Sequence, residues 1–306
     1  KAQIDLYNTR QEEERQKHFR RSCLLYNYGQ EIQMDATFAI WYNREAKALH
    51  LAVDKGTKKV LCGWFDEQET TRAYYIMLMN IIVNYGIPKK IKTDKRGTFS
   101  INNVKTKSKL NTTQFGRICD DLEIQLHSSS DPLFKPNVER ENKTFKGRLI
   151  AELRHENITD SISANDYLNN VFIPKINELF SYPVNPEKND MRKNTYSFEE
   201  LNVIISDQYS RKVDNASSIK YEGKYYIPVD IETGEILSYA RNTECTVIIA
   251  YDYSLLCLIE DKICILSEVK TPEKKVYQKT TKSIEEINRS KAHKPAPNHP
   301  WRNIKS

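Results

Sequence analysis

The order of strand-like and helix-like segments between residues 31 and 180 constrains the fold of this chain more than any other feature. Three strand patterns come first, and then a helix, a strand, a helix, a strand and two helices. Three strands at short spacing predict an antiparallel meander, and strands separated by helices predict parallel pairing. The sequence therefore predicts an α/β domain with a mixed five-stranded sheet and helices on its faces. The expected strands cover 31–43, 47–54, 58–66, 89–94 and 123–129, and the expected helices cover 69–86, 112–122, 136–154 and 163–180, the last one kinked or split at Pro174.

A second pattern begins near residue 210, where short strands recur with turn signals such as Glu222-Gly223 and Thr233-Gly234. This all-β stretch predicts a small β-barrel. The turn-rich, polar stretch before it predicts a linker. The expected organisation is a basic and polar lead-in at 1–27, a core at 28–182, a linker at 183–209, a barrel at 210–269 and a basic, disordered tail at 270–306.

Positive charge gathers at the end of the chain. The whole sequence of 306 residues has a net charge of +6, whereas residues 270–306 alone hold ten Lys and Arg against three Glu. Such a segment suits a polyanion, most often a nucleic acid, and the alternative is a tail that only keeps the protein in solution. The basic end of the lead-in permits the same two interpretations.

The cysteines and the apolar runs exclude several classes of protein. The six cysteines form no Cys-x-x-Cys pair and no zinc-type spacing with histidine, so we expect reduced, buried thiols in an intracellular protein. No apolar run reaches the roughly 18 residues that would cross a bilayer, so no membrane partner is expected. Because the sequence starts at Lys1 without Met, we also expect that it is a fragment with a missing upstream part.

The helix expected after Pro136 carries two neighbouring stripes. Val138 and Phe145 belong to an apolar edge, and Glu139, Lys143 and Lys146 lie beside it. An ordinary amphipathic helix with a solvated charged face would look the same. The functional alternative is a carboxylate in the first turn, kept ionised by the helix N-terminus, followed by two phosphate-binding lysines.

Three carboxylates stand at positions that suit a metal site. Asp35 lies inside the first strand among apolar residues, Asp94 ends the fourth strand, and Glu139 is in the first turn of the helix after the fifth strand. If the first and fourth strands are neighbours, the two aspartates lie side by side. Three carboxylates without His or Cys suit two Mg²⁺ or Mn²⁺ ions in phosphodiester chemistry. The alternative is three unrelated residues: a locally capped Asp35, a turn residue and a helix-start carboxylate.

Seven segments of the chain match one family in order. On these segments the chain resembles the DDE-type transposase and retroviral-type integrase superfamily, and most of all the ISNCY group of bacterial insertion-sequence transposases. The segments are YGQEIQMDAT (28–37), GWFDEQETTRAYY (63–75), YGIPKKIKTDKRGTF (85–99), TQFGRICDDLEIQLHSS (113–129), KPNVERENKTFKGRL (135–149), RKVDNASSIKYEGKYY (211–226) and HKPAPNHPWR (293–302).

The resemblance implies an RNase H-like catalytic core and an SH3-like barrel behind it. It implies that Asp35, Asp94 and Glu139 form the acidic triad, which holds two Mg²⁺ or Mn²⁺ ions, nicks transposon ends and joins the 3′-OH to target DNA. It also implies a homo-oligomer in a synaptic complex and a place in the bacterial cytoplasm at the nucleoid. The residues expected to contact DNA are Lys95, Arg96, Arg140, Lys143 and Lys146.

The chain departs from the family pattern at three points. Ala36 stands where the family usually has Gly, and residues 131–137 read DPLFKPN where the family is richer in Gln, Ala and Gly. The helix-turn-helix region that binds transposon ends in this family is not found in the sequence. Two other functions are therefore kept open: a non-catalytic DNA-binding protein descended from a transposase, and a nuclease of similar fold that only hydrolyses.

Overall fold

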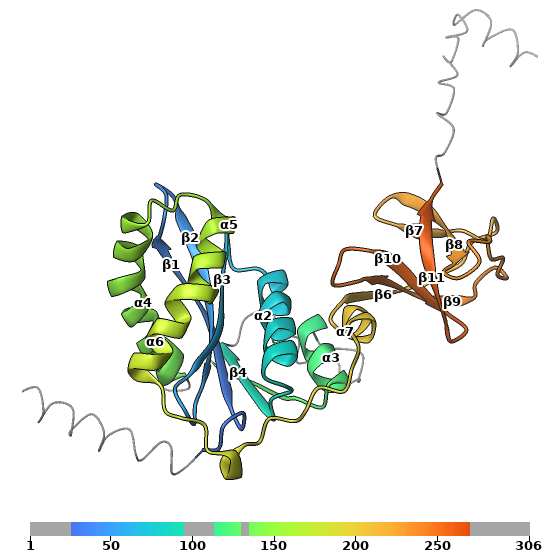
Figure 1. Cartoon of the computed structure of the whole chain (residues 1–306). Coiled ribbons are helices and arrows are strands. Elements are labelled where there is room, and N and C mark those ends of the chain that lie inside the picture. Colours follow the sequence, from blue (N-terminus) through green and yellow to red (C-terminus); the bar gives the residue numbers. More distant parts are fainter. Residues whose placement is uncertain (1–25, 95–112, 130–134, 270–306) are drawn as a thin grey trace, which may run out of the picture.

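A mixed five-stranded sheet forms the core, as the sequence predicts. The computed structural model describes residues 26–94, 113–129 and 135–269 (Figure 1). The strand order is β3-β2-β1-β4-β5, in which β1, β2 and β3 pair antiparallel and β4 pairs parallel with both β1 and β5. The strands are β1 (Ile32–Ile40), β2 (Ala46–Asp54), β3 (Val60–Asp66), β4 (Lys90–Asp94) and β5 (Gln125–Ser129).

Helices cover both faces of this sheet. α2 (Thr71–Asn84) and α3 (Gln114–Asp121) pack on one face, where Ile32 and Met34 of β1 contribute to their apolar cluster. α4 (Pro136–His155), α5 (Ser161–Tyr167), η2 (Leu168–Phe172) and α6 (Ile173–Phe180) cover the other face (Figure 1). Because side chains alternate along a strand, Gln33 and Asp35 of β1 point to this second face, toward α4.

The helix expected over 163–180 is continuous but changes its winding before Pro174. The five residues of η2 form a π-helical turn, in which the Ile173 N–H bonds to the Leu168 carbonyl, five residues back. Proline has no N–H and its ring clashes with the preceding turn, so the wider turn accommodates it. The structure thus has a π-helical turn before Pro174, within one continuous helical run, where the sequence predicts a kink or a split.

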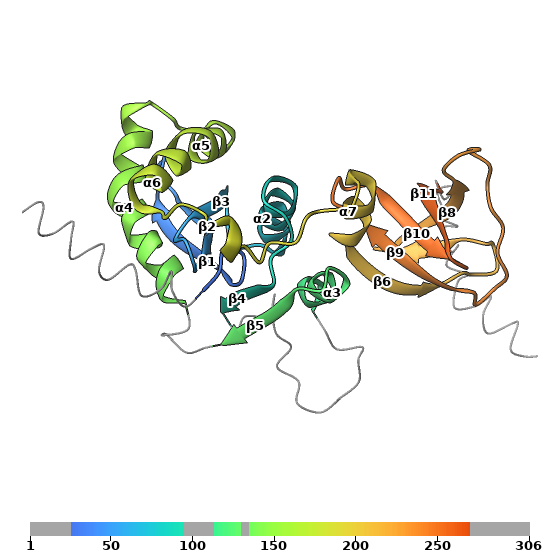
Figure 2. The same ribbon diagram turned by 60° about the horizontal axis from the view of Figure 1, so that its bottom comes forward.

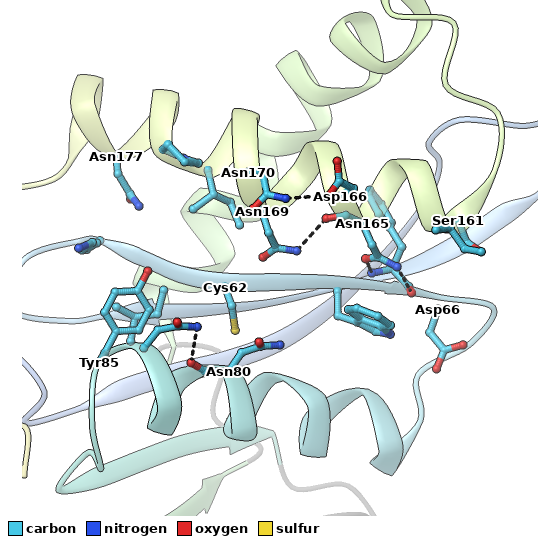
Figure 3. A pocket seen from close by; sticks show the side chains of 18 of the residues that line it. Cys62, Asp66, Asn80, Tyr85, Ser161, Asn165, Asp166, Asn169, Asn170 and Asn177 are labelled. Atoms are coloured by element: carbon cyan, nitrogen blue, oxygen red, sulfur yellow. Dashed lines mark hydrogen bonds between the residues drawn. The ribbon is translucent and has the colours of Figure 1, made fainter. Parts of the chain in front are cut away.

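Asparagines from this helical run satisfy the free edge of β3. The side-chain amides of Asn165, Asn169 and Asn177 each donate to and accept from one backbone residue of β3, namely Phe65, Gly63 and Val60. Figure 3 shows these side chains pointing from the helices to the strand, beside a pocket of about 880 Å³ that also reaches α2. An edge strand whose backbone groups are already bonded cannot pair with another strand.

The second domain is a six-stranded antiparallel sheet with the order β6-β9-β10-β11-β8-β7. An isolated bridge between Val213 and Ile219 joins its two ends, which makes it a nearly closed barrel, as the sequence predicts (Figure 2). The strands are β6 (Asp207–Lys212), β7 (Ile219–Tyr221), β8 (Lys224–Asp230), β9 (Glu244–Ile249), β10 (Leu255–Ile259) and β11 (Lys262–Glu268).

The segment expected as a linker, 183–209, contains η3 (Pro186–Lys188), α7 (Phe198–Ile204) and the start of β6. It lies on the core: Leu201 and Ile205 belong to the apolar cluster under α2 and α3. Hydrogen bonds continue this contact into the barrel, since the Tyr75 hydroxyl donates to Asp207 at 2.6 Å and the Gln114 amide bonds to the Gln208 backbone. The barrel is thus attached to α2 and α3.

The cysteines of the described residues are buried, as the sequence predicts. Every cysteine in the described residues is buried and free, and burial raises the pKa of the Cys62 and Cys119 thiols. Among the helices that the structure describes, none is both long and apolar enough to cross a membrane.

Candidate active site

Asp35 and Asp94 lie on neighbouring strands. β1 and β4 pair in parallel with Ile32 opposite Ile91 and Gln33 opposite Lys92, and the same register brings Asp35 level with Asp94. Their carboxylates both contact one ammonium group: Lys135 Nζ is 2.8 Å from Asp35 Oδ1 and 2.7 Å from Asp94 Oδ1. The structure therefore brings two of the three predicted site residues to one point.

Lys135 was not among the residues that the sequence indicated. It immediately precedes α4, and its side chain is only 2% exposed although it carries a charge. Its side chain makes no cap at the helix start and extends instead to the two aspartates. A buried ammonium is stable only where it is paired, and here two carboxylates supply that pairing.

Two more residues fix α4 beside β1. Asn142 Nδ2 donates to Asp35 Oδ2 at 3.0 Å, and Gln33 Oε1 accepts from the backbone N–H groups of Asn137 and Val138 at 3.1 and 3.5 Å. Gln33 thus replaces the N-cap side chain that α4 lacks. The helix start is held by β1 itself, the strand that carries Asp35.

Glu139 lies on α4 between residues that touch Asp35. Glu139 is four positions after Lys135, and Asn142 is three positions after Glu139, so the three share one stripe of the helix. The Glu139 side chain is exposed, and no group of three His, Cys, Asp or Glu residues in the described ranges comes close enough to hold a metal ion. In this conformation Glu139 does not complete a three-carboxylate set with Asp35 and Asp94.

The expected DNA contacts divide into two groups. Arg140, Lys143 and Lys146 are exposed on α4, where Arg140 and Lys143 line a hollow with Arg148 and Phe180. Lys95 and Arg96 lie outside the described residues. Beside the basic groups, burial raises the pKa of the Glu141 carboxyl, and the nearby charges of Arg140 and Lys58 oppose that rise.

The residues around Asp35 and Asp94 fit a bound cation. Their two carboxylate oxygens already coordinate one positive group, Lys135, which stands in for a metal ion. Asn142 Oδ1 is also buried and has no hydrogen-bond partner in the part of the chain that the structure describes. Hard oxygen donors of this kind suit Mg²⁺ or Mn²⁺.

Two proteins of similar sequence are named as transposases. Over 277 residues, 90% of this chain and 58% of the relative, it is 35% identical to a Streptococcus pneumoniae protein, "Transposase for insertion sequence IS1202". Over most of its length, this chain is therefore similar to an insertion-sequence transposase. It is also 28% identical over 167 residues, 53% of this chain and 35% of the relative, to "Putative transposase y4bF" of Sinorhizobium fredii. The chain thus spans a little over half of the first relative, and no family model matches it.

Solved integrase structures resemble the chain more distantly. The HTLV-2 integrase catalytic core domain in complex with magnesium, in a dimeric form, has 19% identity and a TM-score of 0.40, covering 52% of this chain and 93% of that one. A chain of the simian T-cell lymphotropic virus intasome in complex with a PP2A regulatory subunit has 16% identity and a TM-score of 0.41, covering 80% of each.

Proposed function

We propose that this chain is the catalytic part of a DNA transposase that nicks the ends of an insertion sequence and joins them to target DNA. One observation carries the proposal: two carboxylates from neighbouring strands converge on one cation position in a chain related to insertion-sequence transposases. The catalytic core would be RNase H-like and the barrel SH3-like.

Asp35, Asp94 and Glu139 would hold two Mg²⁺ or Mn²⁺ ions. Bound in this way, the ions would activate the attacking oxygen and stabilise the leaving oxygen of a phosphodiester. The chain's own residues set the geometry for this. Asn142 fixes the orientation of the Asp35 carboxylate, and Gln33 fixes the first turn of α4, which carries Glu139.

DNA would be held by phosphate contacts along α4. Arg140, Lys143 and Lys146 are exposed on this helix, and Lys143 and Lys146 lie one and two turns beyond Glu139. Lys95 and Arg96, after Asp94, would add to these contacts. The protein would work as a homo-oligomer on paired DNA ends, in the bacterial cytoplasm at the nucleoid.

The test replaces Asp94 with Asn and measures nicking and strand transfer on pre-nicked ends of the element with Mn²⁺. We expect Asp94→Asn to lose both activities by at least about 1,000-fold, because an amide supplies neither the charge nor the second oxygen ligand. DNA binding in a gel-shift assay should change less than about threefold, since the phosphate contacts remain. A variant with wild-type nicking would show that the triad is assigned wrongly.

A non-catalytic DNA-binding protein is the second candidate, and the buried Lys135 favours it. A permanent ammonium between Asp35 and Asp94 would leave no room for a metal ion. Such a protein would shift DNA in a gel but show neither Mn²⁺-dependent nicking nor metal binding. Nicking without joined products would instead identify a nuclease.

A further inference from the structure

The side chain of Lys135 is buried inside the site and does not lie on the protein surface. Its side chain is 2% exposed, whereas the lysines of surface ion pairs such as Lys175 and Lys224 are 54% and 58% exposed. It contacts one oxygen of each aspartate at 2.8 and 2.7 Å. Burial on this scale removes an ammonium from water, which only a strong and specific pairing can offset.

A divalent ion between these aspartates would need the same oxygens. An ammonium and a metal ion repel each other at the distances involved, so both cannot occupy the space between Asp35 and Asp94. Lys135 carries one positive charge, whereas a divalent ion would match the two negative charges of both carboxylates. Loading of metal is therefore an exchange of one cation for another.

We propose that Lys135 is a displaceable internal counter-ion, which holds Asp35 and Asp94 together in the metal-free protein and must leave when a divalent ion binds. The proposal rests on the proposed function. It implies that only the molecules in which Lys135 has left the site can bind the metal ion. The metal affinity of the wild-type protein is therefore lowered in proportion to the fraction of such molecules.

The position of Lys135 in the chain links this exchange to Glu139. The Lys135 carbonyl accepts the Glu139 N–H at 3.3 Å, so the two residues share the first turn of α4. The competitor for the carboxylates therefore lies one helical turn before the third predicted carboxylate.

The test measures binding of Mn²⁺ and Ca²⁺ to the full chain by calorimetry, without DNA. Lys135→Met removes the ammonium but keeps much of the apolar stem, and Lys188→Met removes the same charge from an exposed position. If Lys135 occupies the site in about nine molecules of ten, Lys135→Met should bind the ions about tenfold more tightly. Lys188→Met should bind them as the wild type does, and Asp94→Asn should bind them weakly.

A second measurement uses only the wild-type protein and does not depend on how a variant folds. Lys135 should react slowly with an amine-specific reagent in the metal-free protein and several-fold faster with saturating Ca²⁺, as read by mass spectrometry of the peptide that contains it. Lys188 is the internal reference.

The outcomes separate the two proposals. Metal binding that needs Asp94 but is equal or weaker in Lys135→Met, with unchanged Lys135 reactivity, would overturn the displaceable counter-ion and leave the proposed function standing. Absence of metal binding in the wild type and in Lys135→Met alike would overturn both.

Discussion

Two charge clusters lie on the same face of β1, and their balance is opposite. Glu31, just before the strand, is one carboxylate between two lysines, Lys55 at 3.0 Å and Lys92 at 3.2 Å. Four residues further along, Asp35 and Asp94 both contact the ammonium group of Lys135. Among the ion pairs of the described residues, Glu31 thus has two ammonium groups for one carboxylate, and the aspartates have one ammonium group for two carboxylates.

The difference in charge balance makes the Glu31 cluster structural and leaves the Asp35 and Asp94 cluster able to bind a cation. Burial opposes the ionisation of Glu31, but hydrogen bonds from Lys55 and Gln33 and the charges of Lys55 and Lys92 prevail and lower its pKa. The charge of the Glu31 carboxylate is already balanced by Lys55 and Lys92, so this carboxylate does not need a metal ion. In the described residues, Asp35 and Asp94 share one ammonium group, and a divalent ion carries the two charges that match both carboxylates.

The largest effect on stability is expected at Glu31. Glu31→Gln keeps the shape but leaves Lys55 and Lys92 without their carboxylate, so the free energy of unfolding should fall by about 3 kcal/mol. Asp94→Asn should cost less than about 1 kcal/mol, because Asp94 is partly exposed and Lys135 keeps Asp35 as a partner. Urea denaturation of the metal-free protein measures both. If Glu31→Gln and Asp94→Asn lowered the free energy of unfolding equally, both clusters would contribute to stability in the same way.

A smaller effect is expected at Gln33, which connects the clusters. Its amide donates to Glu31 and its carbonyl oxygen accepts from the start of α4. Gln33→Met leaves buried N–H groups without an acceptor, so the free energy of unfolding should fall by about 2 kcal/mol in the same assay.

The control for Gln33 is Gln125→Met, which makes the same change at an exposed strand position. It should change the free energy of unfolding by less than about 0.5 kcal/mol. If Gln33→Met were equally mild, β1 would not hold the helix start in the way the hydrogen bonds indicate.

The sequence was sufficient for a mixed sheet of five strands, because short connections predict antiparallel pairing and helical crossovers predict parallel pairing. It predicted that Asp35 and Asp94 meet only on the condition that the first and fourth strands are neighbours, and the parallel pairing of β1 with β4 fulfils that condition. The short helix α7 was not predicted, although Ser197 and Glu200 form a capping box whose pattern can be recognised in the sequence. The turn-rich composition of the surrounding segment favoured the interpretation as a linker.

The rest of the site depends on contacts between distant parts of the chain. Nothing local in the sequence shows that Lys135 turns away from its own helix start to meet β1 and β4, about 100 and 41 residues earlier. The cap that Gln33 supplies is equally hidden, since capping rules look for a side chain at the helix start and not on a strand 104 residues away. Side chains that act across elements are found only once the elements are packed.

The smallest expected effect is the pH dependence of the Glu31 cluster. The pKa of Glu31 is lowered from its ordinary value of 4.5, so folding favours the ionised carboxylate. The stability that its charge contributes is therefore fully present above pH 4.5 and is lost as the pH falls through the lowered pKa. Glu31→Gln has no charge to lose. The difference in unfolding free energy between wild type and Glu31→Gln should thus be constant from about pH 7 to about pH 5 and narrow below that range. A difference that stays unchanged down to about pH 3 would show that shape and hydrogen bonds, and not charge balance, distinguish this cluster from the aspartate pair.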